Sequence, residues 1–385
     1  MTGETAGIHD CRILVVEDAE PIRRLIGALL AADGISRVVF AEDGVAALDR
    51  LEEFEPHLLV LDMMMPRMDG FELCRRLRAD PRWQRLPILV QTALGSPDER
   101  TEIFRAGATD VISKPIHGPE FLARTRVHLE NRLLIASLLD FQQRLNQDLQ
   151  LARRMQEDLL PSAALVEELA AGHGLVIQSH FQPSSEIGGD FWGIEDLGRG
   201  RVGVFTADLT GHGVSAALNA FRLHTLMRQL APGAGEPAAH LTALNRHLGG
   251  LLPTGQFATL FYGVIDTIAD VLTFSSAGAP DPVLVLEEGA TFEDGSGLPI
   301  GITGEAAYES RRVAFPPGAS LLLYSDALLE SADESGACLG SNDILALVDQ
   351  NRFQQAPLAA LAAAFRRARP RLADDLTLVW ISRSA

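Results

Sequence analysis

The first third of the chain alternates short apolar runs with stretches of helical periodicity. The apolar runs stand in RILVVED, RVVFAED, LLVLDMM, PILVQTA and TDVISKP. Between them, apolar positions recur every three or four residues over 21–32, 45–54 and 71–79, which predicts amphipathic helices. This alternation predicts an α/β doubly wound sheet of five parallel strands, with functional residues at the carboxyl ends of the strands.

Residues 129–160 contain no strand or turn signal, and Pro161 follows them. Their apolar positions have the three-and-four spacing of a heptad seam. The seam consists of Leu138, Phe141, Leu145, Asp148, Ala152, Met155 and Leu159. Asp148 interrupts the apolar pattern, with Leu149 one position away. Two interpretations stay open: one amphipathic helix packed on a neighbouring domain, or a coiled-coil linker that joins two chains in a homodimer.

The remaining chain is richer in strand patterns and glycine turns. Helical periodicity returns at 214–230, 238–251 and 358–369. The order of strand pairs, a helix pair, more strands, a helix and a last strand predicts α+β layers, with a β-sandwich flanked by helices. The predicted domains are residues 10–128, a helical linker 129–160, and residues 161–385.

Composition narrows the class of protein. The 385 residues carry a net charge of −18, which argues against nucleic acid as a partner because phosphate binding requires a basic face. The three cysteines form no CxxC pair, so neither a disulfide framework nor a thiolate metal site is indicated. No leader pattern or membrane-length apolar run occurs, and we expect a cytoplasmic protein without a membrane partner.

Five polar residues follow the predicted strands of the first region. Glu17 and Asp18 end the first strand, Asp62 the third, Thr92 the fourth and Lys114 the fifth. All five fall on one edge of a parallel sheet, where three carboxylates favour a bound Mg²⁺. A carboxylate beside Mg²⁺ and an ammonium group can accept a phosphoryl group, which Thr92 could then hydrogen-bond.

These residues lie in VVEDAE, LDMMMPRMDG, QTA and SKP, and the region resembles the receiver domain of bacterial two-component response regulators. The resemblance implies that a sensor histidine kinase or phosphotransfer protein phosphorylates Asp62. It also implies Mg²⁺ held by Asp18, Asp62 and the carbonyl of Met64, with Glu17 acting mainly through water.

The same resemblance assigns Lys114 to the phosphate and implies a cis bond to Pro115. The family often places a switching Tyr or Phe where this chain has Val111. Signal transmission is therefore expected to rely more on repacking of helix faces than on rotation of a ring.

Four aspartates of the second half each stand where a strand pattern ends or turns. Asp190, Asp208, Asp326 and Asp374 occur in GGDF, TADLTGHG, YSDALLE and DDLT. Carboxylates at strand ends beside glycines are suited to divalent cations. The set indicates a dinuclear site and hydrolytic chemistry, in which a metal-bound water attacks phosphorus without a protein nucleophile.

The segments SSEIGGDFWG, FTADLTGHGVSAAL, GLPIGI and DDLTLVWI resemble the type 2C (PPM family) serine/threonine protein phosphatases of the sporulation and stress-response branch. The resemblance implies two Mg²⁺ or Mn²⁺ ions. Its implied ligands are Asp190, Asp208 as the bridging and catalytic ligand, the Leu209 carbonyl, Asp326 and Asp374, with Asp375 as the less favoured neighbour. Its implied substrate is a phosphorylated anti-sigma-factor antagonist in a partner-switching pathway.

Two details of this region distinguish the chain from the family. Ala327 stands where the family usually has glycine after the third aspartate, and AGAPDP replaces the usual AGHPP. His212 is a turn residue or a proton donor. The main hypothesis is a response regulator with a phosphatase output. The alternative is a catalytically weak or inactive phosphatase-like adaptor that binds a regulatory partner under receiver control.

Overall fold

A computed structural model describes residues 7–93, 96–184, 187–211, 213–230, 236–253 and 255–384. The chain forms two compact units, Met1–Leu145 and Asn146–Ala385. Each unit is described by itself. No helix within these described segments combines the length and apolar character needed to cross a bilayer.

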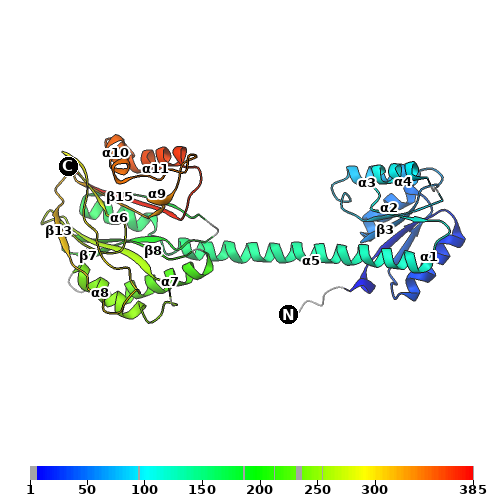
Figure 1. Ribbon diagram of the computed structural model, residues 1–385, viewed down its shortest axis with the longest axis horizontal. Coiled ribbons are helices and arrows are strands. Elements are labelled where there is room, and N and C mark those ends of the chain that lie inside the picture. Colours follow the sequence, from blue (N-terminus) through cyan, green and yellow to red (C-terminus); the bar gives the residue numbers. More distant parts are fainter. Residues whose placement is uncertain are drawn as a thin grey trace. The chain divides into compact units, whose positions relative to one another are not determined.

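The first unit contains a parallel sheet with the strand order β2-β1-β3-β4-β5 (Figure 1). Its strands are β1 (Ile13–Val16), β2 (Val38–Ala41), β3 (Leu58–Asp62), β4 (Ile88–Thr92) and β5 (Asp110–Ser113). Its helices are η1 (Ile8–Asp10), α1 (Glu20–Ala32), α2 (Gly44–Phe54), α3 (Gly70–Ala79), α4 (Pro97–Ala106) and the first part of α5 (Gly118–Glu157). The predicted doubly wound fold is confirmed.

Alternating strand residues bury the two faces of this sheet against different helices. Leu61 and Val90 pack in a core that includes residues of α2, α3 and α4. Val60, Leu89 and Ile112 pack in a second core with residues of α1 and α5. Because side chains alternate along a strand, the residue at each strand end is assigned to one of these faces.

Helix α5 corresponds to most of the predicted linker 129–160, but it begins earlier, at Gly118, and ends at Glu157. Its seam side chains are largely exposed: Leu138 is 62% exposed, Phe141 63% and Leu145 46%. The packing of this helix on a neighbouring domain stays a prediction. The pairing of two copies stays a prediction, as do the domain boundaries.

The second unit is a sandwich of two antiparallel sheets. One has the order β13-β10-β9-β8-β7 and the other β12-β11-β14-β15-β6. The first sheet comprises β7 (Phe191–Gly198), β8 (Arg201–Leu209), β9 (Ala258–Asp266), β10 (Val271–Ala277) and β13 (Arg311–Ala314). The second comprises β6 (Leu175–Gln182), β11 (Val283–Leu286), β12 (Gly289–Phe292), β14 (Ser320–Tyr324) and β15 (Leu376–Arg383).

Helices cover both outer faces of the sandwich (Figure 1). Helices α7 (Val214–Gln229) and α8 (Pro237–Leu248) pack on the first sheet, and α10 (Ser341–Asn351) and α11 (Pro357–Ala368) pack on the second. A third core fills the space between the sheets. Two short helices, α6 (Ala163–His173) and α9 (Ala327–Glu330), complete the unit. The predicted layered sandwich is confirmed, although the sequence did not predict α6 or α10.

Candidate functional site

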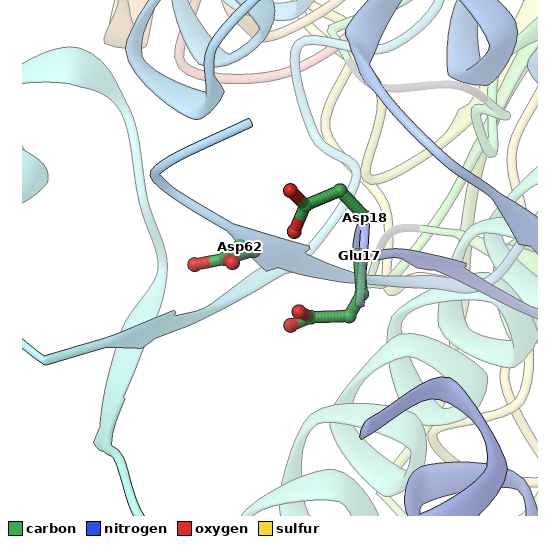
Figure 2. A group of neighbouring side chains, drawn as sticks. All are labelled: Glu17, Asp18 and Asp62. Carbon is green, nitrogen blue, oxygen red and sulfur yellow. The ribbon is translucent and has the colours of Figure 1, made fainter. Parts of the chain in front are cut away.

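Three carboxylates gather at the carboxyl edge of the parallel sheet. Glu17 and Asp18 follow β1, and Asp62 is the last residue of β3. One oxygen from each lies within 4.8 Å of the others, and Figure 2 shows the three side chains as neighbours. Among the described residues, this is the only group of three or more such side chains that meets this distance. A hard cation such as Mg²⁺ fits this donor set.

Lys114 connects two of these carboxylates. Its Nζ lies 2.7 Å from Asp62 Oδ2 and 2.9 Å from Glu17 Oε2. Burial raises the pKa of Glu17 above its ordinary value. Burial acts to lower the pKa of Lys114, but the hydrogen bonds to Asp62 and Glu17 outweigh it, so the pKa is raised. Lys114 is therefore a protonated neighbour of the proposed acceptor at physiological pH.

The other predicted residues lie beside this cluster. Thr92 ends β4 and is 2% exposed, and its carbonyl accepts the backbone N–H of Lys114 at 2.8 Å. The Met64 N–H lies 3.4 Å from Asp62 Oδ1. The Lys114–Pro115 peptide is cis. Val111 is buried in the core formed with α2, α3 and α4, so an aliphatic side chain fills the position of the family's aromatic ring.

The second candidate site draws on both sheets of the sandwich. Asp190 precedes β7, Asp208 lies near the end of β8, Asp326 follows β14, and Asp374 precedes β15. Charge interactions link Asp208 to Asp326 and to Asp374. The four carboxylates are thus coupled, although they do not gather as tightly as the three in the first unit.

Burial and mutual repulsion dominate this second cluster. Burial, followed by the charge of Asp208, raises the pKa of Asp190 well above its ordinary value. Burial and the charge of Asp326 raise the pKa of Asp208 to about 7, and burial with the charge of Glu330 raises that of Asp326 to about 6. Within the described chain, no Lys, Arg or His forms an ion pair with Asp190, Asp208 or Asp326. Divalent cations would neutralise this set, so its chemistry fits metal ligands.

Asp375 has a different environment from Asp374. Its Oδ1 accepts the N–H of Ser184 at 2.7 Å and the hydroxyl at 3.0 Å, and its Oδ2 accepts the N–H of Gly189 at 2.8 Å. The Asp375 carboxylate therefore ties β15 to the GGDF turn. Since both of its oxygens already bind protein donors, Asp374 is the better candidate for a metal ligand.

Close packing against neighbouring atoms explains why the two residues before Asp190 in GGDF are glycines. A Cβ on Gly188 would lie 1.7 Å from Asp375 Oδ2, and one on Gly189 would lie 2.7 Å from the Leu209 carbonyl oxygen. Neither is among the glycines with positive φ, whereas Gly211 and Gly213 are. A positive φ therefore accounts for glycine at Gly211 and Gly213, whereas close packing accounts for it at Gly188 and Gly189.

The sequence did not single out Gln156, which lies near the end of α5 and is 2% exposed. Its Oε1 accepts the N–H of Gly188 at 2.9 Å. Its Nε2 donates to the carbonyl of Gly188 at 2.9 Å and to that of Asp190 at 3.3 Å. Helix α5 therefore contacts the backbone that carries a candidate metal ligand. In the sequence, Gln156 could have been noticed only as a polar residue within the amphipathic run RRMQEDLLP.

Two further predictions concern single residues. Ala327 is fully buried, begins α9 and is not among the non-glycine residues with positive φ, so this position does not require glycine. His212 lies outside the described residues, and its role as turn residue or proton donor stays a prediction.

Comparisons with known proteins agree with this architecture. The family model described as Stage II sporulation protein E (SpoIIE) matches residues 198–384, and the response regulator receiver domain model matches residues 13–126. Response regulator MprA of Mycobacterium avium (strain 104) is 48% identical over 118 residues, which are 31% of this chain and 50% of MprA. The chain thus spans about half the length of the curated relatives it matches.

Solved structures resemble the second unit. The SiaA-PP2C domain of Pseudomonas aeruginosa has a TM-score of 0.56 and 22% identity, and the match covers 63% of this chain and 98% of that domain. The RsbU and RsbW domains of Rv1364c from Mycobacterium tuberculosis match with a TM-score of 0.48 and 25% identity, covering 55% and 62% of the two chains. The SiaA match shows the fold that the two chains share. The chain therefore combines a receiver domain of the response regulator family with a PP2C-like domain of the SpoIIE family.

Proposed function

We propose that this chain is a response regulator phosphorylated on Asp62, whose output is a divalent-metal-dependent phosphoserine/phosphothreonine protein phosphatase. The observation that carries the proposal is a set of mutually repelling carboxylates in a PP2C-like fold, with Asp190 buried and Asp208 and Asp326 half-buried. A cluster of this kind is costly to bury without a cation.

In the receiver, Asp62 is the acceptor. A phosphodonor, a sensor histidine kinase or phosphotransfer protein, presents phosphorus to one Asp62 oxygen, and the P–O or P–N bond to the donor breaks as the new P–O bond forms. Mg²⁺ on Asp18, Asp62 and the Met64 carbonyl would neutralise charge on the transferred oxygens. Lys114 supplies a second cation, and Thr92 a hydroxyl donor, to the bound phosphoryl group. Glu17, whose Oε2 accepts from Lys114, orients that ammonium.

In the output domain, the groups that would hold two Mg²⁺ or Mn²⁺ ions are Asp190, Asp208, the Leu209 carbonyl, Asp326 and Asp374. The ions would supply an activated water and polarise the phosphoester. The chain's own contribution is positional. Asp375 holds the GGDF turn against β15, and the Thr377 hydroxyl donates to Asp190 Oδ2 at 2.6 Å, which fixes one carboxylate oxygen.

Helix α5 supplies the regulatory connection. Its exposed seam favours a homodimer through paired α5 helices, because contiguous apolar surface on a helix is normally buried in an interface. Its last turns carry Gln156, which holds Gly188 and the Asp190 carbonyl. A change in α5 geometry on receiver phosphorylation would therefore reach a metal ligand through three hydrogen bonds.

The proposed substrate is a phosphorylated anti-sigma-factor antagonist, in line with the SpoIIE family match and the sequence motifs. The test is hydrolysis of such a phosphoprotein with Mn²⁺ by the wild-type chain and by Asp208→Asn. Metal-dependent release of phosphate that the substitution abolishes would support the phosphatase. Equal, negligible release by both proteins would favour the adaptor alternative.

A further inference from the structure

Gln91 is a buried polar residue without a partner at the receiver site. It is 0% exposed, and neither Oε1 nor Nε2 has a hydrogen-bond partner in the part of the chain that the structure describes. A buried amide normally finds a partner, since leaving one unpaired forfeits its hydration. An unpaired amide at this position therefore calls for an explanation beyond packing.

The register of the sheet places Gln91 beside the proposed acceptor. Asp62 of β3 pairs with Gln91 of β4, and Gln91 pairs with Ile112 of β5. Paired residues of neighbouring strands are about 5 Å apart and point to the same face. Leu89, two residues earlier, faces the core formed with α1 and α5, so Gln91 lies on that face as well.

Lys114 reaches across the same position. It follows β5, yet its Nζ contacts Asp62 on β3 and Glu17 beyond β1. Because β4 lies between β3 and β5, the Lys114 side chain passes over the end of β4, where Gln91 stands. Gln91 is thus enclosed between the acceptor strand and the lysine strand.

We propose that Gln91 is a positioning residue for the phosphorylated state of Asp62; the inference rests on the proposed function. While Asp62 is a carboxylate, Lys114 donates to its Oδ2. Once Asp62 is phosphorylated, the dianionic phosphoryl group attracts the ammonium more strongly. The Asp62 oxygen that loses Lys114 then accepts from Gln91 Nε2, which is the neighbouring buried donor.

This hydrogen bond affects hydrolysis of the acyl phosphate. Water attacks phosphorus, the P–O bond to Asp62 breaks, and its electron pair returns to the carboxylate, while the water protons pass to inorganic phosphate and solvent. The N–H of Gln91 stabilises negative charge as it develops on the departing carboxylate. Gln91 therefore shortens the lifetime of phospho-Asp62.

The test compares the wild-type chain with Gln91→Met, which keeps the side-chain length and removes the amide. Full-length proteins are labelled with acetyl phosphate and Mg²⁺, the donor is removed, and the loss of phosphate from Asp62 is followed. We expect Gln91→Met to lengthen the lifetime about tenfold, the effect of one hydrogen bond to a developing charge. We also expect its receiver transition to melt roughly 2 to 5 °C higher, because an unpaired buried amide is gone.

Thr125→Val is the matched control. Thr125 lies on α5 between Phe121 and Leu129, is 0% exposed, and its Oγ1 has no partner among the described residues. Its substitution should raise the melting temperature and leave the lifetime unchanged. Equal lifetimes of phospho-Asp62 in the wild type and in Gln91→Met would overturn this inference and leave the proposed phosphorylation standing. A wild type that takes up no more label than Asp62→Asn would overturn the proposed phosphorylation, and this inference with it.

Discussion

The side chain of Gln156 makes a two-way hydrogen bond with the backbone of Gly188, accepting its N–H and donating to its carbonyl, both at 2.9 Å. The helix that leaves the receiver thereby ends on the turn that presents Asp190. We propose that this contact couples phosphorylation of Asp62 to the activity of the second unit.

Gln156→Leu is expected to uncouple the two domains. It leaves the N–H and carbonyl of Gly188 without their partner, which should cost about 2 kcal/mol in the free energy of unfolding of the second unit. Phosphatase turnover should then respond little to beryllofluoride, an acyl-phosphate mimic, whatever its basal level. The control is Gln150→Leu at an exposed position of the same helix. An unchanged response in Gln156→Leu would show that the signal takes another route.

Substitutions of the neighbours Asp374 and Asp375 should distinguish a metal ligand from a residue that stabilises the fold. Asp375→Ala removes an acceptor shared by three donors and should destabilise the second unit by about 3 kcal/mol. Asp374→Ala removes the acceptor of the Asp375 N–H, and we expect it to lower the free energy of unfolding by less than Asp375→Ala does. The Mn²⁺ affinity of Asp374→Ala should fall by more than the roughly 10- to 100-fold typical of outer contacts. Denaturant unfolding and metal titration check both values, and the reverse pattern would make Asp375 the ligand.

The architecture was predictable wherever apolar runs end in polar residues. RILVVED and LLVLDMM placed Glu17, Asp18 and Asp62 on one edge, because parallel strands share a direction, and the structure brings the three together. Helix α10 was not predicted, since its SND start resembles a loop in the sequence. Gln91 and Gln156 were missed for a related reason. Gln91 stands in an apolar strand run and Gln156 in the charged helical run RRMQED, and neither run reveals which hydrogen bonds the side chain makes in the folded chain.

The roles of Gly188 and Gly189 show a second limit of sequence reasoning. Glycine predicts freedom of φ, but here it serves close approach by a carboxylate and a carbonyl from distant strands. Likewise, Ala327 departs from the family pattern, and only the observed α9 shows that alanine fits without strain. The assignment of Asp374 and Asp375 as neighbours with different roles came from resemblance, and the hydrogen bonds of Asp375 now give it a physical reason.

Metal should stabilise the second unit more strongly as pH rises. The pKa values of Asp208 and Asp326, about 7 and about 6 in the folded protein, exceed the ordinary 3.8. The folded state therefore holds protons that the unfolded state releases, and the stability of the metal-free protein is greatest below pH 4 for these groups and falls as pH rises through 6 and 7. Saturating Mn²⁺ should raise the melting temperature by roughly 5 to 10 °C at pH 8 and by less at pH 5. Equal shifts of the melting temperature at pH 5 and pH 8, each measured against a sample with EDTA, would contradict the assignment of Asp208 and Asp326 as metal ligands.

The α5 seam should control the oligomeric state. Leu138 and Phe141 are 62% and 63% exposed, so charging them leaves the isolated helix intact while opposing a paired seam. The double substitution Leu138→Glu/Phe141→Glu should give a monomer by light scattering at concentrations where the wild type is a dimer. Gln143→Glu, off the seam on the same helix, should remain dimeric. A monomeric wild type, with and without beryllofluoride, would remove the dimer from the proposal.

The most direct measurement of the central claim is phosphate release from a phosphoserine-containing anti-sigma-factor antagonist by the full chain with Mn²⁺, with the receiver treated or untreated with beryllofluoride. We predict turnover that EDTA abolishes, that Asp208→Asn lowers by at least about 1,000-fold, and that depends on the state of Asp62. Negligible turnover by the wild type in both receiver states, equal to that of Asp208→Asn, would contradict the phosphatase and leave an adaptor.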